Sequence, residues 1–196
     1  MAHAVQPLDI LDRDAALMAR VARGEEAALR EVAVLHGGRV LRMAQRLLGN
    51  EAEADEIAQE TLLRVWRSAA RFDSARGGLP EWIGTIAWRL CADRLRTPGR
   101  HMQLDLEAAA ELPSTAPDAE SALIRRQKIA QVQGALELLS PRQRAAFVLF
   151  HIEGLGGEAA GKVLGVSTRA FWSLLYRARS AVEREVTILR AKEEFP

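Results

Sequence analysis

The stretch from Glu51 to Arg67 repeats small and apolar residues at the spacing of an α-helix, and this periodicity constrains the fold more than any other feature. Asn50 precedes the stretch and Glu53 follows three residues later, which is the pattern of a capped helix start. We therefore expect a helix over residues 51–67, packed against the core of a helical domain. The residues that recur three or four positions apart and form its predicted buried face are Ala54, Ile57, Ala58, Thr61, Leu62 and Val65.

A second stripe lies beside this predicted buried face and mixes carboxylates with a tryptophan and a leucine. It consists of Asp55, Glu56, Gln59, Leu63 and Trp66. In one interpretation Leu63 and Trp66 simply widen the core. In the other the stripe docks a protein, because exposed apolar patches on monomers are uncommon and usually mark partners.

The pattern predicts a second helix over residues 80–96, with a proline at its first turn. Its apolar stripe is Trp82, Ile83, Ile86 and Leu90. Asp93 falls within this stripe, so it is expected to be buried and paired with an arginine, because an unpaired buried carboxylate is strongly unfavourable.

The opposite side of this helix and the loop before it combine arginines with aromatic residues. Such a surface suits single-stranded nucleic acid, since guanidinium groups follow the phosphates and rings stack on the bases. The candidate residues are Arg71, Phe72 and Arg76 in the loop and Trp88, Arg89 and Arg96 on the helix.

Length and charge favour two small domains and a local, not global, contact with nucleic acid. The chain has 196 residues and a formal net charge of +1, so no large basic surface attracts DNA. Cys91 is the sole cysteine, which excludes an intrachain disulfide and fits a reducing cytoplasm. The first residues lack the pattern of a secretory signal, and no apolar segment is long enough to insert into a membrane.

Enzymatic signatures are absent from the sequence. The four histidines are scattered without metal-ligand spacing, and no glycine-rich phosphate loop occurs. The sequence therefore predicts no catalytic residue, no metal site and no cofactor.

The remaining segments divide the chain into two domains. Residues 12–23, 25–36 and 39–48 are expected to be helices, with Gly37 and Gly38 interrupting or bending the chain between the last two. Residues 1–96 then form the first domain. A proline-rich segment over residues 97–119 predicts a flexible linker, and residues 120–196 form the second domain.

The second domain has the pattern of a helix-turn-helix. Ser140 and Gln143 form a predicted capping box before a helix over residues 142–151. Helices over residues 158–164 and 168–190 follow, with a glycine turn at Gly165 and a serine cap at Ser167. The candidate DNA-reading residues are Ser167, Thr168, Arg169, Trp172, Ser173, Tyr176, Arg177 and Arg179.

Three apolar residues on the last predicted helix have different expected roles. Phe171 is predicted to lie in the core. Trp172 and Leu174 flank Ser173 on the helix predicted to enter the major groove, where arginine and lysine would make the strongest contacts. Either they form an exposed pair that binds protein, or both side chains fold back onto the domain.

These residues together resemble bacterial RNA polymerase sigma factors of the extracytoplasmic-function (ECF) type. In the first domain the resemblance rests on the run from Ala54 to Thr61, Val65-Trp66, Phe72, Trp82-Ile83, Ile86-Ala87 and Asp93-Arg94. In the second domain it rests on Pro141-Arg142-Gln143-Arg144 and on Tyr176-Arg177-Ala178-Arg179. The sequence departs from the family at Trp88-Arg89, where Arg-Asn is usual.

The resemblance implies an all-α protein of two small helical domains joined by a flexible linker. The first domain would bind core RNA polymerase through the 55–66 stripe and melt the minus-ten element of promoter DNA with the residues between 71 and 96. The second would read the minus-thirty-five element. An anti-sigma factor is the other implied partner, and the alternatives are a plain helix-turn-helix regulator or a sigma-like protein that acts through protein contacts.

Overall fold

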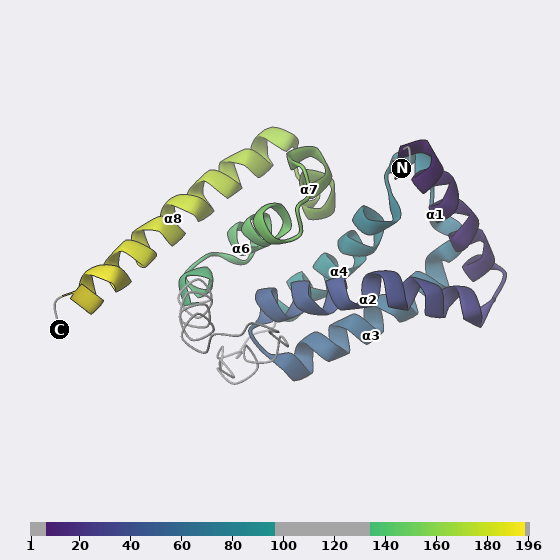
Figure 1. The fold of residues 1–196 in the computed structure, drawn as a ribbon, viewed down its shortest axis with the longest axis horizontal. Coiled ribbons are helices and arrows are strands. Elements are labelled where there is room, and N and C mark those ends of the chain that lie inside the picture. The colour runs from purple at the N-terminus through teal and green to yellow at the C-terminus, as the bar shows by residue number, and fades with distance from the viewer. Residues whose placement is uncertain (1–6, 97–133, 195–196) are drawn as a thin grey trace, which may run out of the picture.

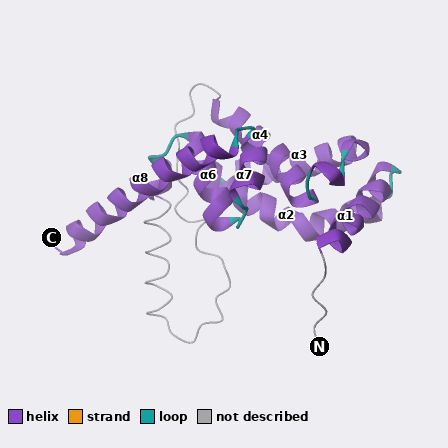
Figure 2. Ribbon diagram, turned by 90° about the horizontal axis from the view of Figure 1, so that it is seen from above, coloured by secondary structure: helices purple, strands orange, loops and turns teal. Residues whose placement is uncertain are grey.

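The computed structural model describes residues 7–96 and 134–194, and within these two stretches every regular element is a helix (Figures 1 and 2). The helices form two groups, one on each side of residues 97–133. This confirms the predicted all-α fold. The predicted linker at residues 97–119 lies outside the described residues, as do residues 120–133 of the predicted second domain.

The first group is a bundle in which α2 and α3 lie side by side and α4 packs against both (Figure 1). Two short 3₁₀ turns, η1 and η2, connect α3 to α4. The bounds of these elements are α1 Pro7–Ala22, α2 Glu26–Leu48, α3 Glu51–Ser68, η1 Ala69–Arg71, η2 Ser74–Arg76 and α4 Leu79–Arg96.

The junction between α2 and α3 follows the predicted capping chemistry. Gly49 ends α2 in the left-handed conformation, with φ of 66°, and its N–H donates to the Gln45 carbonyl at 2.8 Å. Asn50 then begins α3, and its Oδ1 accepts a hydrogen bond from the Glu53 N–H at 2.8 Å. The turn thus satisfies backbone groups at both helix ends.

Of the two predicted effects of Gly37 and Gly38, the interruption is wrong, because α2 runs unbroken through both glycines. Glycine in a helix interior costs only about 1 kcal/mol relative to alanine. Val32 and Val40, on either side of the pair, are both buried. Packing of this face against the neighbouring helices therefore outweighs the low helix propensity.

The buried face of α3 is as predicted at four positions, and two others are half-buried. Ala54, Ile57, Thr61 and Val65 are buried, whereas Ala58 and Leu62 pack at the margin of the core.

The prediction for Asp93 on α4 is right about its pairing with an arginine and wrong about its burial. Its carboxylate does pair with an arginine, Arg96, but both side chains are exposed.

The second group contains the predicted helix-turn-helix, formed by α7 and α8. Helix α6 begins at the predicted capping box, where the Ser140 N–H donates to Gln143 Oε1 at 3.1 Å. The helix predicted over residues 142–151 changes to a π-helical turn at Val148. The bounds are α6 Pro141–Phe147, η4 Val148–Ile152, α7 Gly157–Leu164 and α8 Thr168–Glu194.

The turn between α7 and α8 also follows the sequence prediction. Gly165 ends α7 with φ of 66°, and Ser167 Oγ accepts a hydrogen bond from the Ala170 N–H at 3.2 Å. A Cβ on Gly161 would lie 3.1 Å from the Val166 carbonyl oxygen, so glycine allows the chain to pass close to α7. Phe171 is fully buried below this turn, as predicted.

Candidate polymerase and nucleic-acid interfaces

Helix α3 presents the predicted 55–66 stripe on its outer side. Four members are exposed, namely Asp55, Glu56, Gln59 and Leu63. Leu63 is 47% exposed although it is apolar, whereas Trp66 is half-buried and packs against the core. The core interpretation therefore fits Trp66, and the docking interpretation fits Leu63.

An open depression of about 530 Å³ runs from this stripe to the C-terminal half of α4. Its lining residues are Glu56, Ile57, Gln59, Glu60, Leu63, Arg64, Leu90, Asp93 and Arg94. Acidic and apolar side chains meet here, and Leu63 is the exposed apolar residue among them. A partner that covers this surface would bury one exposed leucine among charged groups, which is the composition of an interface with an apolar centre and a polar rim.

Arg94 connects the two sides of the depression, a role that the sequence analysis did not assign to it. Its Nη2 lies 2.8 Å from Glu56 Oε2, and its Nη1 lies 3.7 Å from Glu53 Oε1. The hydrogen bond with Glu56 raises the pKa of the Arg94 guanidinium. No periodicity within α4 could have indicated this contact, because both carboxylates belong to another helix.

The segment between α3 and α4 carries exposed arginines around an aromatic pair. Arg71 and Arg76 are exposed. Phe72 is half-buried, and its ring meets Trp82 edge-on with 5.5 Å between centroids. The start of α4 is fixed by Asp14, whose Oδ2 accepts a hydrogen bond from the N–H of the first α4 residue, Leu79, at 3.1 Å.

The prediction that Trp88 lies on an open face with the arginines is wrong for this structure. Trp88 is only 6% exposed, whereas Arg89 and Arg96 are exposed. The helical pattern assumed one buried side, but α4 packs against α2 and α3 and also against α7. A helix with neighbours on two sides also buries residues, such as Trp88, that lie outside its single apolar stripe.

Helix α8 presents the predicted polar residues on its outer side. The exposed members are Ser167, Thr168, Arg169, Ser173, Tyr176, Arg177 and Arg179. Tyr176 is 73% exposed, and Arg177 Nη2 donates to Ser173 Oγ at 2.9 Å. This places three arginines, a tyrosine and small hydroxyl groups on the second helix of a helix-turn-helix, where major-groove contacts are made.

Trp172 and Leu174 fit the interpretation that they fold back onto the domain. Leu174 is half-buried against the core. Trp172 is 46% exposed, and its ring meets Phe150 edge-on at a centroid distance of 5.3 Å. A Cβ on Gly157 would lie 2.5 Å from Trp172 Cζ2, so the ring covers the first residue of α7 at a distance that only glycine permits.

Phe150 and His151 complete this aromatic cluster, which the sequence analysis did not predict. The His151 ring lies 5.0 Å from that of Phe150. Burial lowers the pKa of His151, and the charge of Arg179 lowers it further. Both residues belong to the π-helical turn η4, which shifts the helical phase, so a regular helical pattern could not have placed them.

Because Trp172 covers Gly157, substitutions at the two positions should be strongly coupled. We expect Gly157→Ala to lower the free energy of unfolding by about 1–3 kcal/mol, because the new methyl group collides with the indole. In a Trp172→Ala background the same change should cost less than about 0.5 kcal/mol, since the obstacle is gone. Urea denaturation of the four proteins measures this coupling. Equal effects in both backgrounds would contradict it.

The described geometry defines a two-domain helical protein with a helix-turn-helix and exposed arginines on both domains. Within residues 7–96 and 134–194, no helix is long and apolar enough to cross a membrane. The same residues contain no group of three or more histidine, cysteine or acidic side chains suited to hold a metal ion. A helix-turn-helix and exposed arginines are typical of proteins that bind nucleic acid.

Residues 33–101 match the Sigma-70 region 2 family, and residues 129–182 match the Sigma-70 region 4 family. The ECF RNA polymerase sigma factor SigE of Mycolicibacterium smegmatis is 36% identical over 162 residues, which cover 81% of this chain and 62% of SigE. The ECF RNA polymerase sigma factor SigK of Mycobacterium tuberculosis is 33% identical over 141 residues, covering 71% of this chain and 75% of SigK. The chain thus spans less than two thirds of the length of SigE. It spans three quarters of the length of SigK.

A solved structure has the same fold at low sequence identity. The sigma factor RpoE from Bartonella quintana, in complex with the anti-sigma factor NepR, aligns with a TM-score of 0.63 at 20% identity. The alignment covers 81% of this chain and 96% of RpoE.

The two family matches and the identity with SigK show that the chain belongs to the ECF family of RNA polymerase sigma factors. Members of this family are transcription initiation factors and not enzymes.

Proposed function

We propose that this chain binds core RNA polymerase and directs it to a small set of promoters. The observation that carries the proposal is the presence, in family order, of a region 2 domain with an exposed α3 stripe and a region 4 domain with an exposed arginine face. The polymerase supplies the chemistry. Such a factor works in the cytoplasm, where polymerase and DNA are found.

We assign the polymerase contact to the α3 stripe and the adjoining depression. Leu63 is the exposed apolar residue of this surface, and Asp55, Glu56 and Gln59 are exposed on the same helix. Trp66 is half-buried and packs against the core, so it holds this side of α3 in place. Interfaces of this kind depend on a few central apolar residues.

We assign the minus-ten contact to the segment between α3 and α4 and to the exposed arginines of α4. Arg71 and Arg76 lie near the Phe72–Trp82 pair, so phosphate-binding groups and stacking rings occur in one segment. Arg89 and Arg96 extend the basic surface along α4. This combination is suited to a melted strand.

We assign the minus-thirty-five contact to the outer face of α8, with Arg169, Arg177 and Arg179 as the positive groups. Trp172 and Leu174 serve the packing of the domain, so two positions that could carry positive charge do not. We therefore infer that this helix recognises the upstream element weakly or in an unusual way, because arginine and lysine make the strongest contacts in the major groove.

We also propose that an anti-sigma factor binds this chain. The support is the related RpoE structure, which was solved with the anti-sigma factor NepR.

Transcription in vitro tests the proposed function. Core RNA polymerase from the same source is combined with the full chain and a library of genomic fragments, and the transcripts are sequenced. We expect a small group of fragments to be transcribed well above the level of core enzyme alone. A folded protein that yields no such fragment, and that instead binds duplex DNA as a homodimer without polymerase, would favour the plain helix-turn-helix regulator.

A further inference from the structure

Helix α1 supports the segment between α3 and α4 that we assign to the minus-ten contact. The family match begins at residue 33, so it assigns no role to α1. In the structure α1 packs against both turns of the segment, η1 and η2. Leu17, Met18 and Val21 are buried on one side of α1, and Ala69 of η1 is buried as well. The first half of the segment is therefore held by apolar packing next to α1.

The other end of the segment is held by a hydrogen bond to α1. Asp14 Oδ2 accepts a hydrogen bond from the N–H of Leu79, the first residue of α4, at 3.1 Å, and Leu79 is fully buried. The first N–H groups of a helix have no partner within the helix and need an acceptor from elsewhere. The two residues before Leu79 are Gly77 and Gly78, which have no side chain that could provide one. Asp14 therefore caps α4 from a different helix.

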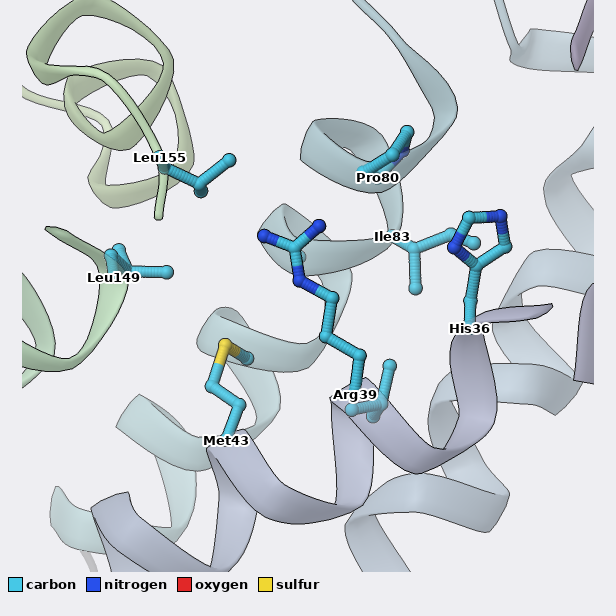
Figure 3. Close-up of a pocket in the computed structure, with 9 residues that line it drawn as sticks. His36, Arg39, Met43, Pro80, Ile83, Leu149 and Leu155 are labelled. Carbon is cyan, nitrogen blue, oxygen red and sulfur yellow. The ribbon is translucent and has the colours of Figure 1, made fainter. Parts of the chain in front are cut away.

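His36 of α2 lies at the same helix start. Together with Pro80 and Ile83 it lines a small cavity of about 20 Å³, and Figure 3 shows it extending from α2 toward α4. Burial lowers the pKa of His36, and the charge of Asp14 opposes part of this shift, so Asp14 lies close to the ring. Side chains from both α1 and α2 thus surround the first turn of α4.

The position of this first turn determines how the aromatic pair of the segment is arranged. Trp82 belongs to the turn, and its ring meets that of Phe72 edge-on. The exposed Arg76 precedes the turn, and Gly77 after it has φ of 149°, a conformation that glycine adopts far more readily than other residues. Without the cap on Leu79, these glycines would offer little resistance to movement of the turn, because glycine restricts the backbone least.

We propose that Asp14 is a positioning residue for minus-ten recognition. By capping Leu79 it fixes the first turn of α4, and so it holds Phe72 and Trp82 in the arrangement that a melted strand would meet. The Asp14 side chain itself does not bind the strand, because a carboxylate repels phosphates. The proposal rests on the proposed function for the identity of the strand, whereas the cap does not.

Hydrogen exchange of the Leu79 amide, followed by NMR, tests the cap in the free chain. We expect Asp14→Ala to accelerate this exchange about fivefold, the factor that corresponds to loss of one helix cap. Asp14→Asn should keep the rate within about twofold of wild type, because asparagine caps helices as well as aspartate does. Asp12 is exposed on the same helix, so Asp12→Ala is the matched control and should leave the rate unchanged. Equal rates in Asp14→Ala and Asp12→Ala would overturn the proposal.

A spectroscopic signal reports on the aromatic pair itself. In chains labelled with fluorotryptophan, the fluorine resonance of Trp82 should shift in Asp14→Ala, while that of Trp172 in the second domain stays constant. Asp14→Asn should restore the wild-type position of the Trp82 resonance. A resonance that does not move in Asp14→Ala, although Leu79 exchanges faster, would show that the cap does not position the pair.

Holoenzyme binding measures the consequence for DNA. The chain and core RNA polymerase are titrated with a fragment from the transcription screen whose minus-ten strand is unpaired. We expect Asp14→Ala to bind this fragment about fivefold more weakly than wild type, and Asp14→Asn and Asp12→Ala to bind it within about twofold of wild type. Loss of a negative charge alone would strengthen DNA binding, so weaker binding is specific to loss of the cap. Wild-type affinity in Asp14→Ala excludes the positioning role.

Asp14→Glu provides a second route if Asp14→Ala fails to fold. It keeps the charge but lengthens the side chain by a methylene group, so the carboxylate is displaced from the Leu79 N–H. We expect faster exchange at Leu79, a shifted Trp82 resonance and weaker binding of the fragment, and wild-type behaviour in all three would contradict the proposal. If no fragment is transcribed, the proposed function fails and the minus-ten role fails with it, even where Leu79 exchanges faster. If fragments are transcribed and Leu79 exchange is unchanged, only the role of Asp14 fails.

Discussion

Replacement of Arg144 by methionine is expected to lower the free energy of unfolding by about 3–5 kcal/mol, because several buried backbone carbonyl groups lose their charged donor. Arg144 is 4% exposed. Its guanidinium donates to the carbonyl oxygens of Leu136 at 2.8 Å, Leu47 at 2.9 Å and Glu137 at 3.1 Å. Methionine keeps most of the volume but provides no donor, so buried carbonyl groups lose a hydrogen bond at about 1–3 kcal/mol each.

The neighbouring Arg142 provides the control, because it lies on the same helix and is exposed. Arg142→Met should change stability by no more than about 0.5 kcal/mol. Arg144→Lys should stay well below wild-type stability, since one ammonium group cannot reproduce the planar fork that reaches carbonyls on different segments. Urea denaturation followed by circular dichroism measures all three variants. Equal midpoints for Arg144→Met and Arg142→Met would contradict the assigned role.

The burial of Arg144 could not be predicted from the sequence, although the helix start beside it could. It was part of the Pro141–Arg144 motif that resembles the sigma family, and the capping box beside it was predicted from local spacing. Its burial was not predictable, because one of its acceptors is the Leu47 carbonyl, 97 residues earlier in the chain. Local patterns determine helix ends, but they carry no information on which distant carbonyl will accept a hydrogen bond.

The same distinction explains the outcome at the predicted interfaces. Asn50, Gly165 and Ser167 act through backbone groups within a few residues, and the structure has them as predicted. Trp88 and Asp93 were misplaced because their burial depends on how many neighbours α4 has and where those neighbours end. A helical wheel describes one isolated helix, so it cannot predict that a second side of that helix is also covered by neighbours.

Gly157 and Trp172 form an intermediate case. The sequence showed an aromatic residue where a positive charge would suit DNA, and it left both interpretations open. The decisive observation is the absence of a Cβ at Gly157, on the preceding helix, which makes room for the indole ring. That relation joins two helices of one motif, so a glycine near the start of the first helix and a tryptophan early in the second could serve as a signal in related chains.

Substitution of Leu63 by aspartate should weaken binding to core RNA polymerase by about thirtyfold or more, because a central interface residue commonly contributes about 2 kcal/mol or more. The side chain is 47% exposed in the free chain, so the carboxylate remains solvated and folding should be unaffected. On the bound surface the same carboxylate would lose its water and join the acidic Glu56 and Glu60 that line the depression.

Leu35 on α2 offers the matched control, because it is 51% exposed and lies away from the depression. Leu35→Asp makes the same chemical change and should leave the affinity for core polymerase within about twofold of wild type, as expected for a surface change of less than about 0.5 kcal/mol. Trp66→Ala should weaken binding as well, but with some loss of stability, since its ring packs against the core. Titration of labelled chain with core enzyme, followed by fluorescence anisotropy, measures each dissociation constant. If Leu63→Asp binds as tightly as Leu35→Asp, the polymerase contact lies on another face of the domain.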